Sequence, residues 1–284
     1  MFKLSAFFWL LLAAAYSVSA HTYLYRLKVD GKDTKRGEYI RPYRESTVNS
    51  PVKNLKSEDL RCRTSNMDAK ATKILTLKAG KPFGLEFHET SDTSRFIEPA
   101  HKGPVMIYLA PLESNGEGNV WFKIFEKGFD PKTKKFYTEE LMATEGKMEF
   151  AIPEDIPAGE YLMRTDILAL HTAGTENGAE FYPNCVQIKL ESEGKAKPKG
   201  YAIPGIYSPK DPGILINIYS PVTSYKIPGP PLYSKELGTT PKNQDGQPQE
   251  EDDKPVRDKP QGSNAIVPLI NKPCNGRKRK RHFK

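Results

Sequence analysis

Residues 73–88, KILTLKAGKPFGLEFH, alternate between apolar and polar side chains along most of their length. Phe83, Leu85 and Phe87 fall on one face with a period of two, which is the pattern of a β-strand with one buried face. The small pair Ala79-Gly80 interrupts the alternation and marks a break between two strands. We therefore predict two short strands here, each with one face in a core.

Further segments have a strand-like composition, and proline and glycine separate them. Short strands with long loops and no sustained helical period are typical of a β-sandwich. We predict an all-β fold, an immunoglobulin- or fibronectin-III-like antiparallel β-sandwich with long loops. Residues 161–170 are ambiguous, because their apolar spacing also suits a short helix. The predicted strands are 104–110, 120–125, 148–152, 161–170 and 185–190.

The N-terminus resembles a secretory signal. Residues 1–20 contain one lysine, an apolar run over 7–15 and the small residues Val18-Ser19-Ala20 before a cleavage point. The apolar run is too short to span a membrane as a helix. We predict that residues 1–20 are a signal peptide, that the protein is secreted and extracellular, and that His21 is the first residue of the mature chain.

An N-terminal histidine can chelate a metal through its imidazole and its α-amino group. The amine has a reference pKa of about 7.7–8, so a divalent metal can displace its proton near neutral pH. A signal peptide can also end before a histidine by chance. His21 alone is therefore only a candidate ligand.

The C-terminal part of the sequence has the composition of a disordered tail. From about residue 235 apolar residues become rare, as in TTPKNQDGQPQEEDDKPVRDKPQGSN at 239–264. We predict a folded domain over 21–234 and a low-complexity tail over 235–284. The basic end RKRKRHFK at 277–284 is a solvated tail, a patch for an anionic wall polymer or membrane with cell-wall association, or a dibasic processing site. These alternatives stay open.

Histidines and cysteines supply the other candidate functional groups. His88 alternates with Phe87 and is expected to face outwards from its strand, and His282 lies in the tail. His101 stands in EPAHKGPVMIYLAP at 98–111, in a loop just before a predicted strand, which suits a rigid ligand, although a histidine in such a place, taken alone, is more often an ordinary surface-loop residue. His171 stands in ALHTAGTENGAEFYPNC at 169–185. Of the three cysteines, two are expected to pair in an oxidising compartment.

Several of these segments, taken together and in order, resemble a fungal lytic polysaccharide monooxygenase of auxiliary activity family 9. The resemblance covers nearly all of the predicted folded domain, and motifs in register are more specific than any one of them. The matching segments are His21, NSPVKNLKSEDLRC at 49–62, AHKGPVMIYLAP at 100–111, VWFKI at 120–124, IPAGEYLMRTDILALHTAGTENGAEFYPNC at 156–185 and DPGILINIYSPVTSYKIPGPPLY at 211–233.

The resemblance implies a copper centre with one ion, the histidine brace. His21 would supply its amino group and a ring nitrogen, His101 a third nitrogen, and Tyr182 an axial oxygen. Nitrogen donors in this arrangement suit Cu(II), which the Irving–Williams order also favours. His171 would occupy the second sphere, bond the oxygen co-substrate and help to deliver protons.

The resemblance also implies the reaction and its partners. A polysaccharide, cellulose or a related β-glucan, would be cleaved oxidatively at C1 and/or C4, with an external electron donor and with oxygen or hydrogen peroxide. We expect a monomer that binds no nucleic acid. Tyr225, Tyr43 and Tyr207 are the expected sugar-stacking residues. Two rival readings are a copper-binding or transport protein of the same fold and a cell-wall-bound structural protein.

One position departs from the family pattern. Glu180 stands where the family usually has glutamine, two residues before Tyr182. A carboxylate there is expected to stabilise Cu(II) over Cu(I) and to change the pH dependence of catalysis. The resemblance further implies that Cys62 and Cys185 form a long-range disulfide, which leaves Cys274 without an obvious partner.

Overall fold

The computed structural model describes residues 22–42, 50–63, 72–89 and 96–234. The predicted signal peptide, His21, Tyr43 and the predicted tail from residue 235 lie outside the described residues. Among the described residues, no helix is both long and apolar enough to cross a membrane.

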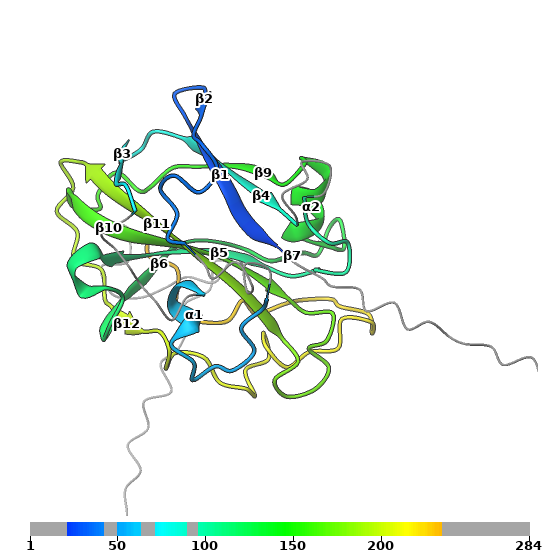
Figure 1. Cartoon of the computed structure of the whole chain (residues 1–284). Coiled ribbons are helices and arrows are strands. Elements are labelled where there is room, and N and C mark those ends of the chain that lie inside the picture. Colours follow the sequence, from blue (N-terminus) through cyan, green and yellow to red (C-terminus); the bar gives the residue numbers. More distant parts are fainter. Residues whose placement is uncertain (1–21, 43–49, 64–71, 90–95, 235–284) are drawn as a thin grey trace, which may run out of the picture. The chain divides into compact units, whose positions relative to one another are not determined.

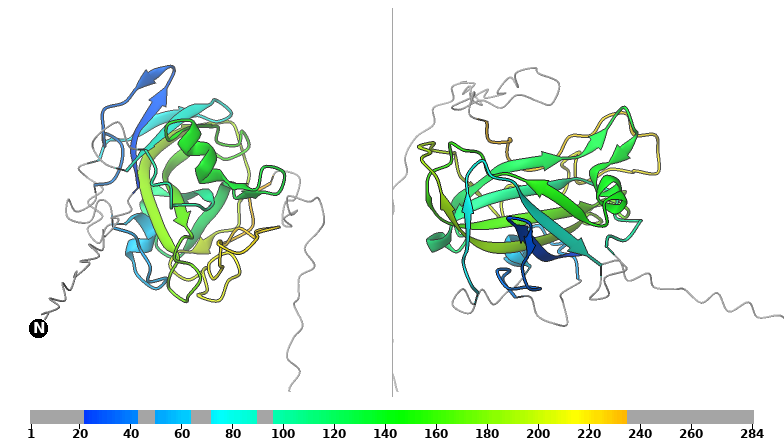
Figure 2. Two further views of the ribbon diagram at one scale, coloured as in Figure 1. Left: turned by 90° about the vertical axis from the view of Figure 1, so that its right-hand side faces the viewer. Right: turned by 90° about the horizontal axis from the view of Figure 1, so that it is seen from above.

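Two β-sheets form the body of the protein, with the layer of β1, β4 and β9 lying over that of β5, β6, β10 and β11 (Figures 1 and 2). Neighbouring strands are antiparallel apart from β11 and β3, which are parallel. The four-stranded sheet has the order β2(Lys32–Asp33), β1(Tyr23–Val29), β4(Phe83–His88), β9(Lys147–Phe150). The six-stranded sheet has the order β12(Tyr201–Ala202), β6(Asn119–Lys127), β5(Val105–Pro111), β10(Gly159–Ala169), β11(Glu180–Glu191), β3(Leu75–Lys78).

Short elements complete the described chain. The strands β7(Phe129–Asp130) and β8(Lys135–Phe136) pair with each other and lead into the helix α2(Tyr137–Ala143). The helix α1(Asp59–Cys62) follows the loop of residues 50–58, and a 3-10 turn, η3(Leu112–Ser114), follows β5.

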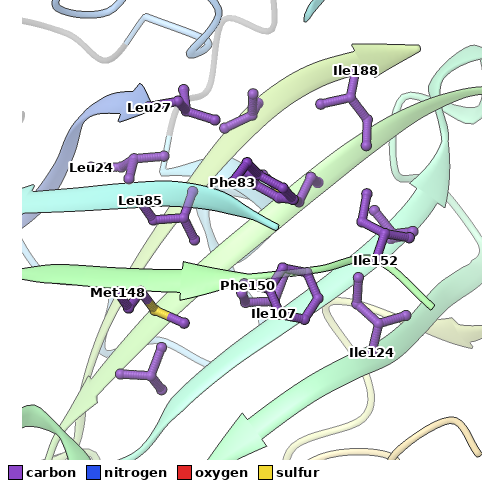
Figure 3. Close-up of a cluster of buried hydrophobic side chains, with 14 of the residues drawn as sticks. Leu24, Leu27, Phe83, Leu85, Ile107, Ile124, Met148, Phe150, Ile152 and Ile188 are labelled. Atoms are coloured by element: carbon purple, nitrogen blue, oxygen red, sulfur yellow. The ribbon is translucent and has the colours of Figure 1, made fainter. Parts of the chain in front are cut away.

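The main hydrophobic core lies between the two sheets (Figure 3). Leu24, Leu85 and Phe150 project from the four-stranded sheet towards Ile107 and Ile188 of the six-stranded sheet. Each of these side chains is buried, and full burial of one such side chain stabilises the fold by about 1.5–3 kcal/mol. The period-two pattern of 73–88 therefore predicts correctly which face of β4 is inside.

A second core covers the opposite face of the six-stranded sheet. Loop residues such as Val52 and Ile214, together with Leu60 of α1, pack there against Phe181 and Leu162 of the sheet. Strands β10 and β11 are consequently buried on both faces, and for this reason their apolar residues do not alternate cleanly. This resolves the ambiguity at 161–170, which is a strand.

The predicted β-sandwich is confirmed, while its closer likeness to immunoglobulin or fibronectin type III domains stays a prediction. Each predicted segment lies on a strand, although β11 begins at Glu180 rather than at 185. The prediction missed β1, the two-residue strands β2, β7, β8 and β12, and the helices α1 and α2. Both helices are short, so they show no sustained helical period.

The prediction that His88 faces outwards from its strand is right about its direction, but the side chain is not exposed to solvent. His88 does point away from the core between the sheets, but its ring is buried. It stacks on Tyr25 with ring centroids 4.1 Å apart, and Phe96 meets it edge-on. Its Nε2 lies 2.6 Å from Glu86 Oε1. Neighbouring side chains thus cover the outer face of the sheet here.

Candidate metal centre

The loop before β5 holds His101 at the end of the sandwich. Gly103 packs so closely on β10 that a Cβ atom there would lie 1.8 Å from the carbonyl oxygen of Leu168. The Gly103 N–H donates to Thr138 Oγ1 of α2 at 2.9 Å, and Leu170 N–H donates to the carbonyl of Lys102 at 2.9 Å. A glycine and a helix therefore fix this loop beside the end of β10, and His101 is completely buried.

His171 lies in the connection between β10 and β11. The two strands pair antiparallel up to Ala169 and Glu180, so the connection begins and ends at neighbouring points. Within it, the Ala173 N–H donates to the Leu170 carbonyl at 3.0 Å, and Thr172 Oγ1 donates to the Gly178 carbonyl. These turns bring His171, whose side chain is 15% exposed, back towards the start of β11.

Glu180 and Tyr182 point to the same side of β11, because alternate residues of a strand share a face. The Tyr182 hydroxyl donates to Glu180 Oε2 at 2.7 Å and lies 3.4 Å from His101 Nε2. The rings of His101 and Tyr182 have centroids 4.9 Å apart. Both the phenol and the carboxylate are buried.

The two histidines and the glutamate form a compact cluster. One ligand atom from each of His101, His171 and Glu180 lies within 4.8 Å of the others. The histidine rings stack with centroids 5.1 Å apart, and Glu180 Oε2 lies 3.7 Å from His171 Nε2. Lys53 closes the outer side with Nζ 2.8 Å from Glu180 Oε1.

Burial and neighbouring charges shift two pKa values at this cluster. Burial, and then the adjacent Glu180 carboxylate, raises the pKa of Tyr182 far above its ordinary value. The hydroxyl consequently remains a hydrogen-bond donor at neutral pH. Burial opposes ionisation of Glu180, but the hydrogen bonds from Lys53 and Tyr182 outweigh that effect and lower its pKa. The cluster therefore carries a buried, ionised carboxylate beside two imidazoles.

The disulfide between Cys62 and Cys185 is confirmed. It fixes α1 to the strand that carries Tyr182. Arg63, the next residue, places its guanidinium carbon 5.5 Å from the centre of the Tyr182 ring. One side of the cluster is thus supported by a segment about 120 residues away in sequence.

The tyrosines expected at a sugar-binding face lie in different settings. Tyr207 is only 7% exposed and its hydroxyl lies 2.8 Å from that of Tyr108, so it offers no surface ring. Its loop folds over the six-stranded sheet, and the ring packs against Phe181 in the second core. The half-buried Tyr225 donates its hydroxyl to the Gly213 carbonyl at 2.6 Å.

Tyr219 is a surface aromatic that the sequence analysis did not select. Its side chain is 78% exposed. The Ile216 N–H donates to the Ala173 carbonyl at 2.9 Å, which fixes this loop to the connection that carries His171. The Tyr219 N–H donates to Asn217 Oδ1 at 3.0 Å. The family resemblance pointed to Tyr225, and no period or motif in the sequence singled out Tyr219.

Comparison with known proteins identifies the family. The family model of Auxiliary Activity family 9 (formerly GH61) matches residues 21–226. The chain belongs to Auxiliary Activity family 9. The matched span begins at His21 and includes every residue of the cluster. The sequence resemblance is therefore confirmed.

Curated relatives and solved structures agree with membership of family 9. The AA9 family lytic polysaccharide monooxygenase A of Aspergillus niger is 41% identical over 227 residues, which are 78% of this chain and 55% of the relative. The protein of the same name from Aspergillus fumigatus is 40% identical over 78% of this chain and 64% of its own length. This chain thus spans little more than half the length of such relatives. The solved structure of CvAA9A superposes with a TM-score of 0.69 at 32% identity, covering 75% of this chain and 98% of that one.

Lys53 is the member of the cluster that sequence reasoning missed. It lies in the loop before α1 and is 127 residues from Glu180 along the chain. Nothing in its local sequence marks it as different from Lys56. Only the pairing of its loop with β11 brings it to the site.

Proposed function

We propose that the mature chain is a secreted, copper-dependent lytic polysaccharide monooxygenase that oxidatively cleaves cellulose or a related β-glucan at C1 and/or C4. The observation that carries this proposal is the convergence of His101, His171, Glu180 and Tyr182 at one end of the sandwich in a family 9 chain. The names of the relatives, lytic polysaccharide monooxygenases, support the reaction class.

The donor set fits a copper ion. His101 Nε2 and the Tyr182 hydroxyl face each other at 3.4 Å, and the cluster offers nitrogen and oxygen donors rather than oxygen alone. Imidazole ligands suit copper, and an open tetragonal site suits Cu(II). We propose that His101 and Tyr182 hold the ion together with the amino group and ring of His21. Bound copper would supply one-electron redox chemistry towards oxygen or hydrogen peroxide, with electrons from an external donor.

The remaining residues would control protons and substrate. His171 is partly exposed and stacked on His101, so its ring can pass a proton between solvent and the reacting oxygen atoms. Glu180 accepts the hydrogen bond that the Tyr182 hydroxyl donates, and this bond fixes the orientation of the phenol ring. Tyr219 supplies an exposed ring on the neighbouring loop for stacking on a sugar face.

Product analysis tests this function directly. Copper-loaded chain beginning at His21 would be incubated with cellulose, xyloglucan, xylan and ascorbate, and soluble products measured by mass spectrometry. We expect oxidised oligosaccharides that disappear in His21→Ala and His101→Ala. A chain with one alanine added before His21 keeps the imidazole and loses the terminal amine at that residue, so it should also be inactive. Tight copper binding without oxidised products on any glycan would favour the copper-binding or transport alternative.

A further inference from the structure

The ion pair between Lys53 and Glu180 is built by the backbone. Val52 forms an isolated antiparallel bridge with Phe181, with its N–H donating to the Phe181 carbonyl at 2.8 Å and its carbonyl accepting from the Phe181 N–H at 3.1 Å. In an antiparallel pair, the residue after one partner lies opposite the residue before the other. Lys53 therefore stands directly across from Glu180, and such side chains are neighbours on one face.

The segment that carries Lys53 is fixed to β11 at two points. The Val52–Phe181 bridge holds one end, and the Cys62–Cys185 disulfide holds the other. These contacts lie four residues apart on β11. Lys53 cannot slide along the strand without breaking one of them. The 2.8 Å contact with Glu180 Oε1 is consequently a built feature rather than the chance meeting of two surface side chains.

The two oxygens of Glu180 have different partners. Oε1 faces Lys53 on the outer side, while Oε2 accepts from the Tyr182 hydroxyl at 2.7 Å and lies 4.0 Å from His101 Nε2. The carboxylate thus joins a half-exposed ammonium, 45% exposed, to the buried proposed ligands. A negative charge beside a copper site favours Cu(II), whose charge is greater than that of Cu(I). A positive charge paired with it offsets that preference.

We propose that Lys53 is a positioning and charge-compensating residue of the metal centre, which holds the Glu180 carboxylate in place and offsets its effect on the redox balance of the bound metal. The inference rests on the proposed copper site. It assigns to this chain a lysine–glutamate pair that acts as a unit, in which removal of either charge alone changes the reduction potential.

The experiment measures the properties of the bound copper ion rather than the cleavage of a polysaccharide. The full mature chain and its variants would be loaded with copper, and the midpoint potential and Cu(II) affinity measured together with unfolding of the copper-free protein. We expect Lys53→Met to lower the potential, with the preference for Cu(II) over Cu(I) rising on the order of tenfold. Glu180→Gln should raise the potential. The Lys53→Met/Glu180→Gln double variant should return close to the wild-type value, and Lys53→Arg should retain it.

A matched control distinguishes the effect of the Lys53–Glu180 pair from the effect of losing one positive charge anywhere on this segment. Lys56→Met removes the same charge from an exposed position of the same segment and should leave the potential unchanged. An unchanged potential in Lys53→Met, equal shifts in Lys53→Met and Lys56→Met, or a double variant whose potential stays as far from the wild-type value as that of either single variant would each overturn the proposal. If Lys53→Met lowered only the stability of the copper-free protein and left the potential unchanged, Lys53 would have a purely structural role, and the proposal would be overturned as well.

The measured potentials test the role of Lys53 whether or not the chain cleaves a polysaccharide. A wild-type chain that binds copper and releases no oxidised oligosaccharides contradicts the monooxygenase function, while the shifts in potential still decide the role of Lys53. A chain that fails to bind copper overturns both.

Discussion

The Arg63 guanidinium donates a hydrogen bond through Nη1 to the carbonyl oxygen of Thr22 at 2.9 Å. Nη2 donates to Asn184 Oδ1 at 3.1 Å, and the same oxygen accepts the Leu24 N–H at 3.1 Å. Arg63 is buried, as are Thr22 and Asn184. Thr22, which follows His21 and precedes β1, is thereby fixed to the strand that carries Tyr182.

Arg63→Met is therefore expected to destabilise the protein. The substitution removes a charged donor from buried oxygen acceptors, which costs about 1–3 kcal/mol. The free energy of unfolding of the copper-free chain, from denaturant titration, measures this loss. Because the residue after His21 is no longer held, copper affinity should also fall.

Arg61→Met is the matched control for Arg63. The Arg61 side chain, itself 13% exposed, pairs with Glu58 and Glu117, whose carboxylates are 64% and 67% exposed, and an ion pair to an exposed carboxylate contributes at most about 1 kcal/mol. Its copper affinity should equal that of the wild type. Equal losses of stability and copper affinity in the two variants would show that the contact with Thr22 has no special role.

Reduction of the disulfide should cost more than loss of any single side-chain contact. Cys62 and Cys185 are 123 residues apart, and closing a loop of this length stabilises a fold by about 4–5 kcal/mol in the chain-entropy model. We expect Cys62→Ser/Cys185→Ser to shift the denaturant midpoint strongly downwards. The double variant and its disulfide-bonded reference protein would both carry Cys274→Ser, which prevents thiol exchange. An equal denaturant midpoint in the two proteins would refute the expected stabilisation by the disulfide.

Ionised Glu86 is expected to account for part of the loss of stability in acid. Burial opposes its ionisation, but hydrogen bonds from Arg26 and His88 outweigh this and lower its pKa. A lowered folded-state pKa means that the ionised group stabilises the protein above the ordinary value of 4.5. That contribution is lost as the pH falls through the lower, folded-state pKa.

Glu86→Gln should accordingly be less stable than wild type at pH 6–7, and the difference should shrink as the pH falls below about 4.5. Thermal unfolding across this pH range measures it. Glu149→Gln, which removes an exposed carboxylate from the neighbouring strand β9, is the control. A difference that stays constant down to pH 3 would mean that the ionised form of Glu86 is not the stabilising species.

Tyr219→Ala should weaken glucan binding without affecting the metal centre. Loss of an exposed ring that stacks on a sugar costs roughly threefold to tenfold in affinity. Binding to insoluble cellulose and copper affinity would be measured in parallel. Tyr207→Phe is the comparison, because the buried Tyr207 should leave cellulose binding unchanged. A greater loss of binding in Tyr207→Phe than in Tyr219→Ala would contradict the assignment.

The sequence predicted the sandwich well because its strands obey local rules. The alternation of Phe83, Leu85 and Phe87 follows from a strand with one buried face. The helix–strand ambiguity at 161–170 arose because β10 is buried on both faces, and burial of that kind removes the alternation. The burial of His88 also escaped prediction, since Tyr25 and Phe96 cover it from other elements.

By itself, the sequence determined the β-rich body, the family and the residue types His101, His171, Glu180 and Tyr182, because these depend on local patterns and motifs. Through the family resemblance it also implied that these residues share one centre. Only the tertiary structure decided that Lys53 pairs with Glu180 and that Tyr219 rather than Tyr207 is exposed. Each of these depends on the pairing of segments more than 30 residues apart or on which loop covers the sheet. Such pairings arise from packing and register across the whole fold, which no local sequence window contains.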